Sequence, residues 1–206
     1  MRIVRIVPSR HKKDRVLVFL EDGALLKVTG QELLDFGLRR GDDLDGETLA
    51  KLKRAGNLSH VKETAAAMIG RRAMSRQELA KKLREKGAGE EEAETAVQWL
   101  ASIGALDDAA YAGALVRRCA ALGYGPAKTR EKLREKGIPR ELWEESLQEL
   151  PPSEAGIDAF LAGKLRGRRP EEGEKRRLTN ALLRRGYGWE DIKDAWSRLG
   201  AEIGEE

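Results

Sequence analysis

The sequence KLREKG occurs at Lys82–Gly87 and again, 50 residues later, at Lys132–Gly137. A weaker copy, ALLRRG, ends at Gly186, another 49 residues along the chain. An internal period of about 20 to 50 residues is typical of an array of small units rather than of one globular core. Because glycine commonly follows the last turn of a helix, each copy predicts a helix that stops at its glycine.

Apolar residues recur at fixed distances from these glycines. A leucine stands four residues before each one, and apolar residues stand six, ten and thirteen residues after it. The last three positions have the spacing i, i+4, i+7, which marks one face of a helix. Each unit therefore has a middle helix, a glycine stop and a final amphipathic helix. The positions are Leu83, Leu133 and Leu182 before the glycine, and Ala93, Val97, Leu100, Trp143, Leu147, Leu150, Ile192, Trp196 and Leu199 after it.

The segments upstream of the middle helices supply a first helix for each unit, at about 61–71, 108–122 and 154–165. Ser75 and Glu78 have the spacing of a capping box, and Pro126 suits the first position of a helix. Asp107, in the run LDDAAYA, is expected to cap the helix that follows it. Three units of three helices result.

The first 56 residues have a different pattern. Residues 3–7, 15–20 and 24–28 predict short strands, with turn residues at 21–23. Thr29 and Glu32 predict the start of a short helix over 31–36, and a second helix is expected over 47–54.

The expected fold is mainly α, with three tandem three-helix repeats in an elongated, curved array after a small β-containing extension. The expected divisions are 1–56 for the extension and 57–106, 107–152 and 153–206 for the repeats.

The composition favours small helical units with long charged faces. Among 206 residues, 36% are charged and only 5% are aromatic, and the net charge is +4. The single cysteine, Cys119, excludes an intrachain disulfide and is expected to be a small buried residue. With neither a signal peptide nor a membrane span in the sequence, we expect a soluble cytoplasmic monomer with no membrane contact.

Basic residues concentrate on the three middle helices. Residues 76–86, 126–136 and 175–185 each contain five Lys or Arg, against two, two and no acidic residues. A row of such helices would make a positive stripe able to bind a partner. The alternative is that these side chains are solvated and pair with the acidic final helices. The candidate residues are Arg76, Lys81, Lys82, Arg84, Lys86, Lys128, Arg130, Lys132, Arg134, Lys136, Lys175, Arg176, Arg177, Arg184 and Arg185.

No motif indicates catalysis. The two histidines, His11 and His60, lie outside the repeats, and the sequence has no HExxH, CxxC, GxSxG or P-loop. We therefore expect no enzyme activity, no catalytic or metal-binding residues and no cofactor. Of the four tryptophans, Trp143 and Trp196 are expected in the cores, whereas a surface role is open for Trp99 and Trp189.

Several motifs together resemble the RecX family, the bacterial regulators of the RecA recombinase. They are LDDxxYA at Leu106–Ala112, GxGPxxxxxxLxxKGI at Gly123–Ile138, SxxELxxKL at Ser75–Leu83, and RRGY with Ile192 in the third unit. The extension, with FGLRRGDDL at Phe36–Leu44, is similar to that of longer members. Thr129 departs from the family pattern, which has an aliphatic residue at this core position.

The resemblance implies that the protein binds the RecA filament on single-stranded DNA in its helical groove, spanning neighbouring protomers. Filament growth and the recombinase, ATPase and coprotease activities of RecA would then be reduced. The alternative from the residues is a DNA-binding helical module, because small three-helix units with basic middle helices can act as helix-turn-helix domains. The small net charge argues against strong direct DNA binding and leaves weak binding open.

Overall fold

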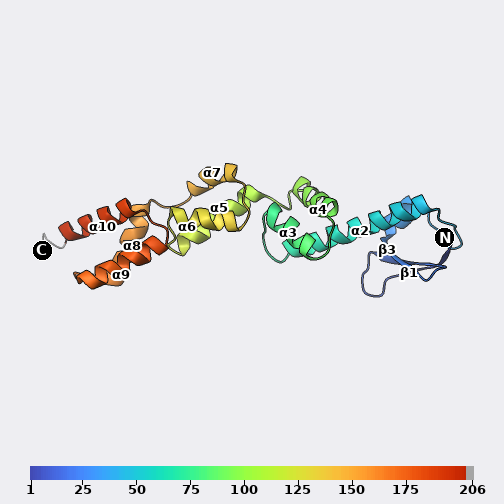
Figure 1. Cartoon of the computed structure of the whole chain (residues 1–206), viewed down its shortest axis with the longest axis horizontal. Coiled ribbons are helices and arrows are strands. Elements are labelled where there is room, and N and C mark those ends of the chain that lie inside the picture. Colours follow the sequence, from blue (N-terminus) through green and yellow to red (C-terminus); the bar gives the residue numbers. More distant parts are fainter. Residues whose placement is uncertain (203–206) are drawn as a thin grey trace. The chain divides into compact units, whose positions relative to one another are not determined.

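The computed structural model describes residues 1–202 of the chain (Figure 1). These residues form two compact units, which are described separately. The N-terminal unit comprises Met1–Arg72 and Leu79–Ala105, and the C-terminal unit comprises Ala73–Glu78 and the described residues 106–202. The fold is mainly helical with one small sheet, as the sequence predicted.

The sheet consists of β1 (Ile3–Pro8), β2 (Arg15–Leu20) and β3 (Leu25–Thr29), antiparallel in the order β1-β2-β3. All three expected strands are confirmed to within a residue or two. Alternate residues of β2 and β3, including Val18 and Val28, face a core that also contains Leu52 from helix α2. One face of the sheet is thereby buried, as period-2 patterning requires.

Helix α1 (Gly30–Asp35) begins with the expected capping box. The Thr29 side chain accepts a hydrogen bond from the amide of Glu32, and the Glu32 carboxylate accepts one from the amide of Thr29. Further along the chain, Asp45 caps the next helix by accepting a hydrogen bond from the amide of Thr48.

That helix, α2, runs without interruption over Gly46–Ile69, so the prediction of separate helices at 47–54 and 61–71 was wrong. Gly56 and Asn57 are poor helix formers, but packing against the sheet overrides this preference. A Cβ atom on the buried Gly56 would lie 2.7 Å from the carbonyl oxygen of Lys27, so glycine is what lets α2 approach β3. The expected boundary between residues 56 and 57 falls inside this helix.

Helices α3 (Arg76–Glu85) and α4 (Glu90–Ser102) follow. Within the N-terminal unit, α2 packs against α4. Leu83, Ala93, Val97 and Leu100 are all buried, which confirms the expected register around Gly87.

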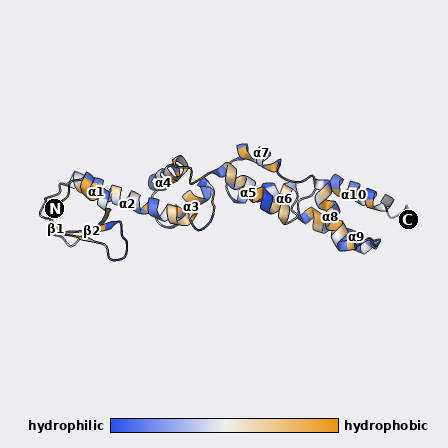
Figure 2. Cartoon of the chain, turned by 180° about the vertical axis from the view of Figure 1, so that it is seen from behind, coloured by the Kyte–Doolittle hydropathy of each residue, from blue (hydrophilic) through white to orange (hydrophobic). Residues whose placement is uncertain are grey.

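The C-terminal unit contains α5 (Asp108–Ala121), α6 (Pro126–Glu135), the 3-10 turn η1 (Arg140–Leu142), α7 (Trp143–Leu147), α8 (Ser153–Leu165), α9 (Glu172–Arg184) and α10 (Trp189–Glu202). Leu133 and Leu182 are fully buried in two separate cores, and the ribbons in Figure 2 alternate between hydrophilic and hydrophobic residues as amphipathic helices do. The final helix of the second repeat is shorter than expected, because Pro139 precedes a 3-10 turn and Pro151–Pro152 cannot continue α7.

Thr129 occupies a core position, as expected. This side chain is fully buried, and its hydroxyl group donates a hydrogen bond to the carbonyl oxygen of Gly125 at 3.0 Å. The polar group therefore has a partner inside the core, which removes most of the cost of burying it.

Middle helices meet end to end at two helix junctions in the C-terminal unit. At one, the amides of Gly125 and Ala127 donate to the carbonyl oxygens of Arg185 and Gly186, at 2.8 and 3.1 Å. At the other, the Ser75 hydroxyl group donates to the carbonyl oxygen of Lys136 at 2.5 Å. Ser75 precedes Gly125 by 50 residues and Lys136 precedes Arg185 by 49, so both junctions use equivalent positions of the repeat.

The first junction requires glycine on both sides. A Cβ atom on Gly125 would lie 2.6 Å from the carbonyl oxygen of Gly186, and one on Gly186 would collide with the backbone nitrogen of Lys128. Gly186 also has a φ of 86°, in the region where a side chain is strained. The repeat glycines therefore end one helix and make room for the start of another.

Gly186→Ala should destabilise the protein by about 2 kcal/mol or more, because backbone strain and a backbone collision act together. At about 2–4 °C per kcal/mol for a chain of this size, the melting temperature measured by circular dichroism should fall by at least about 4 °C. Gly173→Ala, in the helix that ends just before Gly186, is the matched control, since Gly173 has ordinary φ and no atom within 4 Å of the added methyl group. Equal melting temperatures for the two variants would contradict the junction geometry.

Candidate functional site

The candidate cations lie where the sequence placed them, on or directly after α3, α6 and α9. Most are exposed, whereas Lys82, Lys128, Lys132, Lys136 and Arg185 are half-buried. The structure divides the fifteen residues into three groups with different surroundings.

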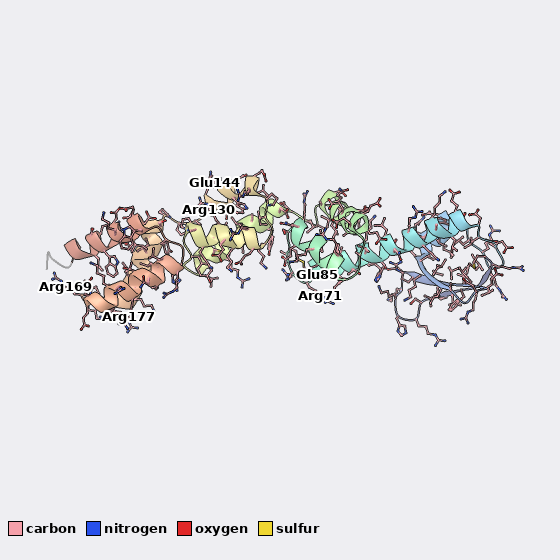
Figure 3. The ribbon with its side chains drawn as sticks, in the orientation of Figure 1. Arg71, Glu85, Arg130, Glu144, Arg169 and Arg177 are labelled. Atoms are coloured by element: carbon pink, nitrogen blue, oxygen red, sulfur yellow. The ribbon has the colours of Figure 1, made fainter. Side chains whose placement is uncertain are left out.

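The first group consists of six cations that pair with carboxylates. Arg130 of α6 points toward Glu144 of α7 in Figure 3, with 3.5 Å between nitrogen and oxygen. The hydrogen bond with Glu135 raises the pKa of Lys132, and the same bond lowers the pKa of Glu135. Each exposed pair adds only about 0–1 kcal/mol to stability, but it neutralises local charge. The pairs are Lys81–Glu85, Arg84–Glu90, Lys128–Glu131, Arg130–Glu144, Lys132–Glu135 and Lys136–Glu78.

The second group, Lys175 and Arg185, packs against the third repeat. The Arg185 guanidinium group donates to the carbonyl oxygens of Leu122 and Gly123, at 2.8 and 3.2 Å. It also lies 5.0 Å from the ring centre of Phe160, and the Lys175 ammonium group lies 5.7 Å from that of Trp196. These contacts are cation–π interactions and caps of helix ends, so they hold the unit together.

The third group carries the uncompensated charge. Within residues 1–202, seven side chains of the set form no ion pair, no hydrogen bond and no cation–π contact, and we call these the unpaired cations. They are Arg76, Lys82, Lys86, Arg134, Arg176, Arg177 and Arg184. Each middle helix contributes at least one of them, so every repeat retains free positive charge.

The run LDDAAYA has two capping roles, of which the sequence indicated one. Asp107 accepts hydrogen bonds from the amides of Ala109 and Ala110, which confirms the expected cap on α5. The neighbouring Asp108 is buried and accepts a hydrogen bond from the amide of Arg76 at 2.9 Å, at the start of α3. The second role joins residues 32 positions apart. The only sequence signal for it is that two aspartates stand next to each other.

The four tryptophans differ in burial, and the two expected in the cores, Trp143 and Trp196, are found there. Trp143 and Trp196 pack against the two cores and donate hydrogen bonds to Ile138 and Thr179. Trp99 is half-buried beneath the ammonium group of Lys62, whereas Trp189 is 58% exposed. Trp189 is therefore the tryptophan available for contact with a partner.

An exposed apolar pair distinguishes the third repeat. In the first repeat, Arg84 and Glu90 form an ion pair at 2.6 Å. Counted from the repeat glycines, Leu183 and Trp189 occupy the same two positions, and both are exposed. The third repeat thus offers apolar surface where the first has a closed ion pair.

Cys119 is buried, as expected, and burial raises the pKa of its thiol. We expect the folded protein to react with a disulfide reagent at pH 8 at least about 100-fold more slowly than the unfolded chain, because the thiolate is the nucleophile. The measurement is the rate at which the reagent's own thiol is released, in buffer and in guanidinium chloride. Comparable rates would show that Cys119 is accessible.

Two family models match this chain. The first three-helix domain of RecX matches residues 62–100, and the second matches residues 107–147. The regulatory protein RecX of Pseudomonas entomophila is 36% identical over 134 residues, which are 64% of this chain and 86% of that protein. The chain belongs to the RecX family. A RecX of Clostridium botulinum (strain Alaska E43 / Type E3) is 27% identical over 202 residues, covering 94% of this chain and 93% of that RecX.

Solved RecX structures share the fold. A crystal structure of regulatory protein RecX matches this chain with a TM-score of 0.72 and 24% identity, and the match covers 100% of this chain and 99% of the RecX chain. RecX from Lactobacillus salivarius matches 71% of this chain and 99% of its own, with a TM-score of 0.63 and 22% identity.

The described residues carry neither a membrane-spanning helix nor a metal-binding cluster. Over residues 1–202, no helix combines the length and apolarity needed to cross a membrane. In the same range, no group of three His, Cys, Asp or Glu side chains could hold a metal ion. The RecX relatives are named regulatory proteins rather than enzymes.

Proposed function

We propose that this protein is a non-enzymatic regulator of RecA that acts as a monomer. It binds the RecA filament on single-stranded DNA in the helical groove, limits filament growth and lowers recombinase and ATPase activity. Membership of the RecX family is the observation that carries this proposal. The proposed division into an extension (1–56) and repeats (57–106, 107–152 and 153–206) gives one contact region per repeat.

The unpaired cations are the proposed contacts with the filament. The paired cations are already neutralised by carboxylates of the same or the neighbouring repeat, so they contribute less to an attractive field. Several weak contacts along one chain add through effective concentration, so each repeat needs only modest affinity. The exposed Leu183 and Trp189 would add apolar contact in the third repeat.

Direct binding to DNA is the second candidate function. It is favoured by the exposed Trp189 in the same repeat as the unpaired Arg176, Arg177 and Arg184, because an aromatic ring with nearby cations suits stacking on single-stranded bases. Binding to bare DNA should weaken steeply with salt, by about 0.7 in log affinity per phosphate contact and decade of salt. Affinity for bare single strands equal to that for the filament would favour this second function.

The test of the first function uses one unpaired cation from each middle helix. The variant Lys86→Glu/Arg134→Glu/Arg184→Glu should raise the concentration that half-inhibits RecA ATP hydrolysis on single-stranded DNA by about tenfold or more, because repulsion replaces attraction at three contacts. All three side chains are exposed, so the melting temperature should remain near that of the native protein.

The matched control reverses three exposed cations that lie outside the middle helices, Arg40→Glu/Arg54→Glu/Lys164→Glu. The change in net charge is the same, so inhibition by the control should stay near the native level. If both variants inhibit RecA as well as the native protein does, the unpaired cations are only a solvated face. If the native protein leaves ATP hydrolysis unchanged, the proposed regulation of RecA itself is wrong.

A further inference from the structure

A cavity in the N-terminal unit has no place in the proposed regulation of RecA. It lies among β2, β3, α2 and the loop before β2, and its volume is about 630 Å³. This size is within the range of about 300–1,000 Å³ that is typical of small-molecule sites. Leu17, Leu25 and Leu52 supply apolar lining, and Lys12, Arg15, Lys27 and Lys53 supply positive charge.

Arg15 is the buried polar group of this cavity. Its side chain is only 4% exposed, and its Nε donates to the Glu63 carboxylate at 2.8 Å. Nη1 lies at the long distances of 3.4 and 3.5 Å from the carbonyl oxygens of Gly56 and Lys27. Nη2 is buried and has no hydrogen-bond partner among the described residues. A buried donor without a partner costs about 1–3 kcal/mol of stability. A ligand that brings a hydrogen-bond acceptor to the Arg15 guanidinium group would remove that cost.

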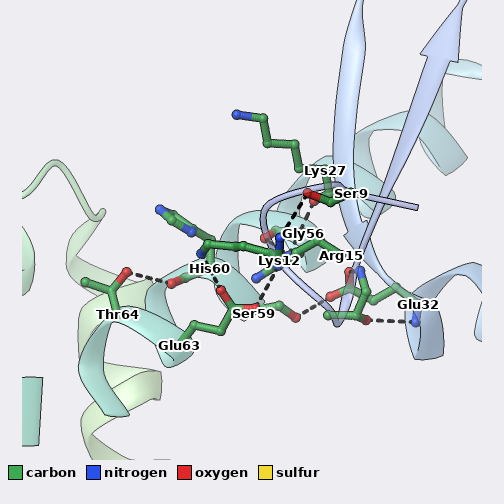
Figure 4. Close-up of polar contacts among 11 residues, drawn as sticks. Ser9, Lys12, Arg15, Lys27, Glu32, Gly56, Ser59, His60, Glu63 and Thr64 are labelled. Carbon is green, nitrogen blue, oxygen red and sulfur yellow. Dashed lines mark hydrogen bonds and ion pairs between the residues drawn. The ribbon is translucent and has the colours of Figure 1, made fainter. Parts of the chain in front are cut away.

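The surrounding charge is strongly positive. Figure 4 shows Lys12 and Arg15 converging on Glu63, which shares its carboxylate between them. Burial raises the pKa of Glu63, but the hydrogen bonds from Lys12 and Arg15 outweigh it and lower the pKa overall, so this carboxylate is ionised. Lys27 and Lys53 are exposed and form no ion pair within the described chain. Four cations therefore line the cavity, only two of them are paired with Glu63, and none of the lining residues is acidic.

We propose that this cavity binds a nucleotide, with its phosphate group held by Arg15, Lys27 and Lys53 and its base against Leu17 and Leu25. Guanidinium and ammonium groups are the usual partners of phosphate oxygens. The outward-facing Leu25 is 41% exposed and pairs across the sheet with Phe19, so an apolar ring would cover surface that is now open to water. The nucleotide is either free or part of a single strand, because both present the same phosphate and base.

The test is calorimetric titration of the full chain with adenosine monophosphate at low ionic strength. Lys27→Ala/Lys53→Ala should weaken binding by at least about tenfold, since it removes two exposed cations that hold the phosphate group. Lys13→Ala/Lys51→Ala is the matched control, because both residues are exposed lysines beside the cavity that do not line it. The control should bind within about twofold of the native protein. Arg15→Met should also abolish binding if circular dichroism shows that it remains folded.

Three further arms use the native protein. Adenosine, which lacks the phosphate group, should not bind measurably, and inorganic phosphate should compete with adenosine monophosphate. If a 12-nucleotide single strand competes with adenosine monophosphate, and Lys27→Ala/Lys53→Ala weakens binding of that strand, the site is assigned to nucleic acid. If the strand does not compete, the site is assigned to free nucleotides. The proposal is overturned if adenosine monophosphate does not bind, if adenosine binds equally well, or if the two lysine pairs have equal effects.

Discussion

The carbonyl groups that end α9 accept hydrogen bonds from the amides that begin α6, and the organisation of the C-terminal unit depends on this contact. The ends of an isolated helix leave such groups without partners and carry partial charges of opposite sign. Joining one end to another satisfies both groups and brings the opposite charges together. The contact needs two glycines, because Gly125 and Gly186 approach each other too closely for a side chain. The repeated glycine is thus a packing residue as well as a helix stop.

The same geometry explains why several basic residues of the middle helices already have partners within the protein. Lys136 and Arg185 end their helices at the two junctions, and both interact with neighbouring repeats there. The i, i+3 spacing of Lys128 with Glu131, and of Lys132 with Glu135, pairs further cations along one helix. Only the unpaired cations have no such contact within the described residues. The regular distribution of charge in the sequence therefore reflects helix capping and ion pairing in part.

Features encoded locally could be predicted from the sequence. The strands, the capping box at Thr29 and Glu32, the cap at Asp107 and the buried register of Leu83, Leu133 and Leu182 all depend on neighbours within a few turns. The continuity of α2 could not, because it depends on Gly56 meeting a strand nearly 30 residues earlier. The pairing state of each cation and the cavity around Arg15 also escaped prediction. Both arise where side chains from separate elements converge, and periodicity carries no information about that convergence.

The head-to-tail contacts also bear on how such a chain can change length during evolution. Each junction joins only successive copies, so stability in this part of the chain is built from nearest-neighbour terms, and copies can be gained or lost as whole modules. Insertions and deletions inside a module are constrained differently. The segment around Gly123–Lys128 tolerates none, since a shift of one residue would put a side chain against the carbonyl group of Gly186. The connection at 166–171 contains none of the residues that form the two junctions and can absorb such changes, which accounts for spacings of 50 and 49 residues within one molecule.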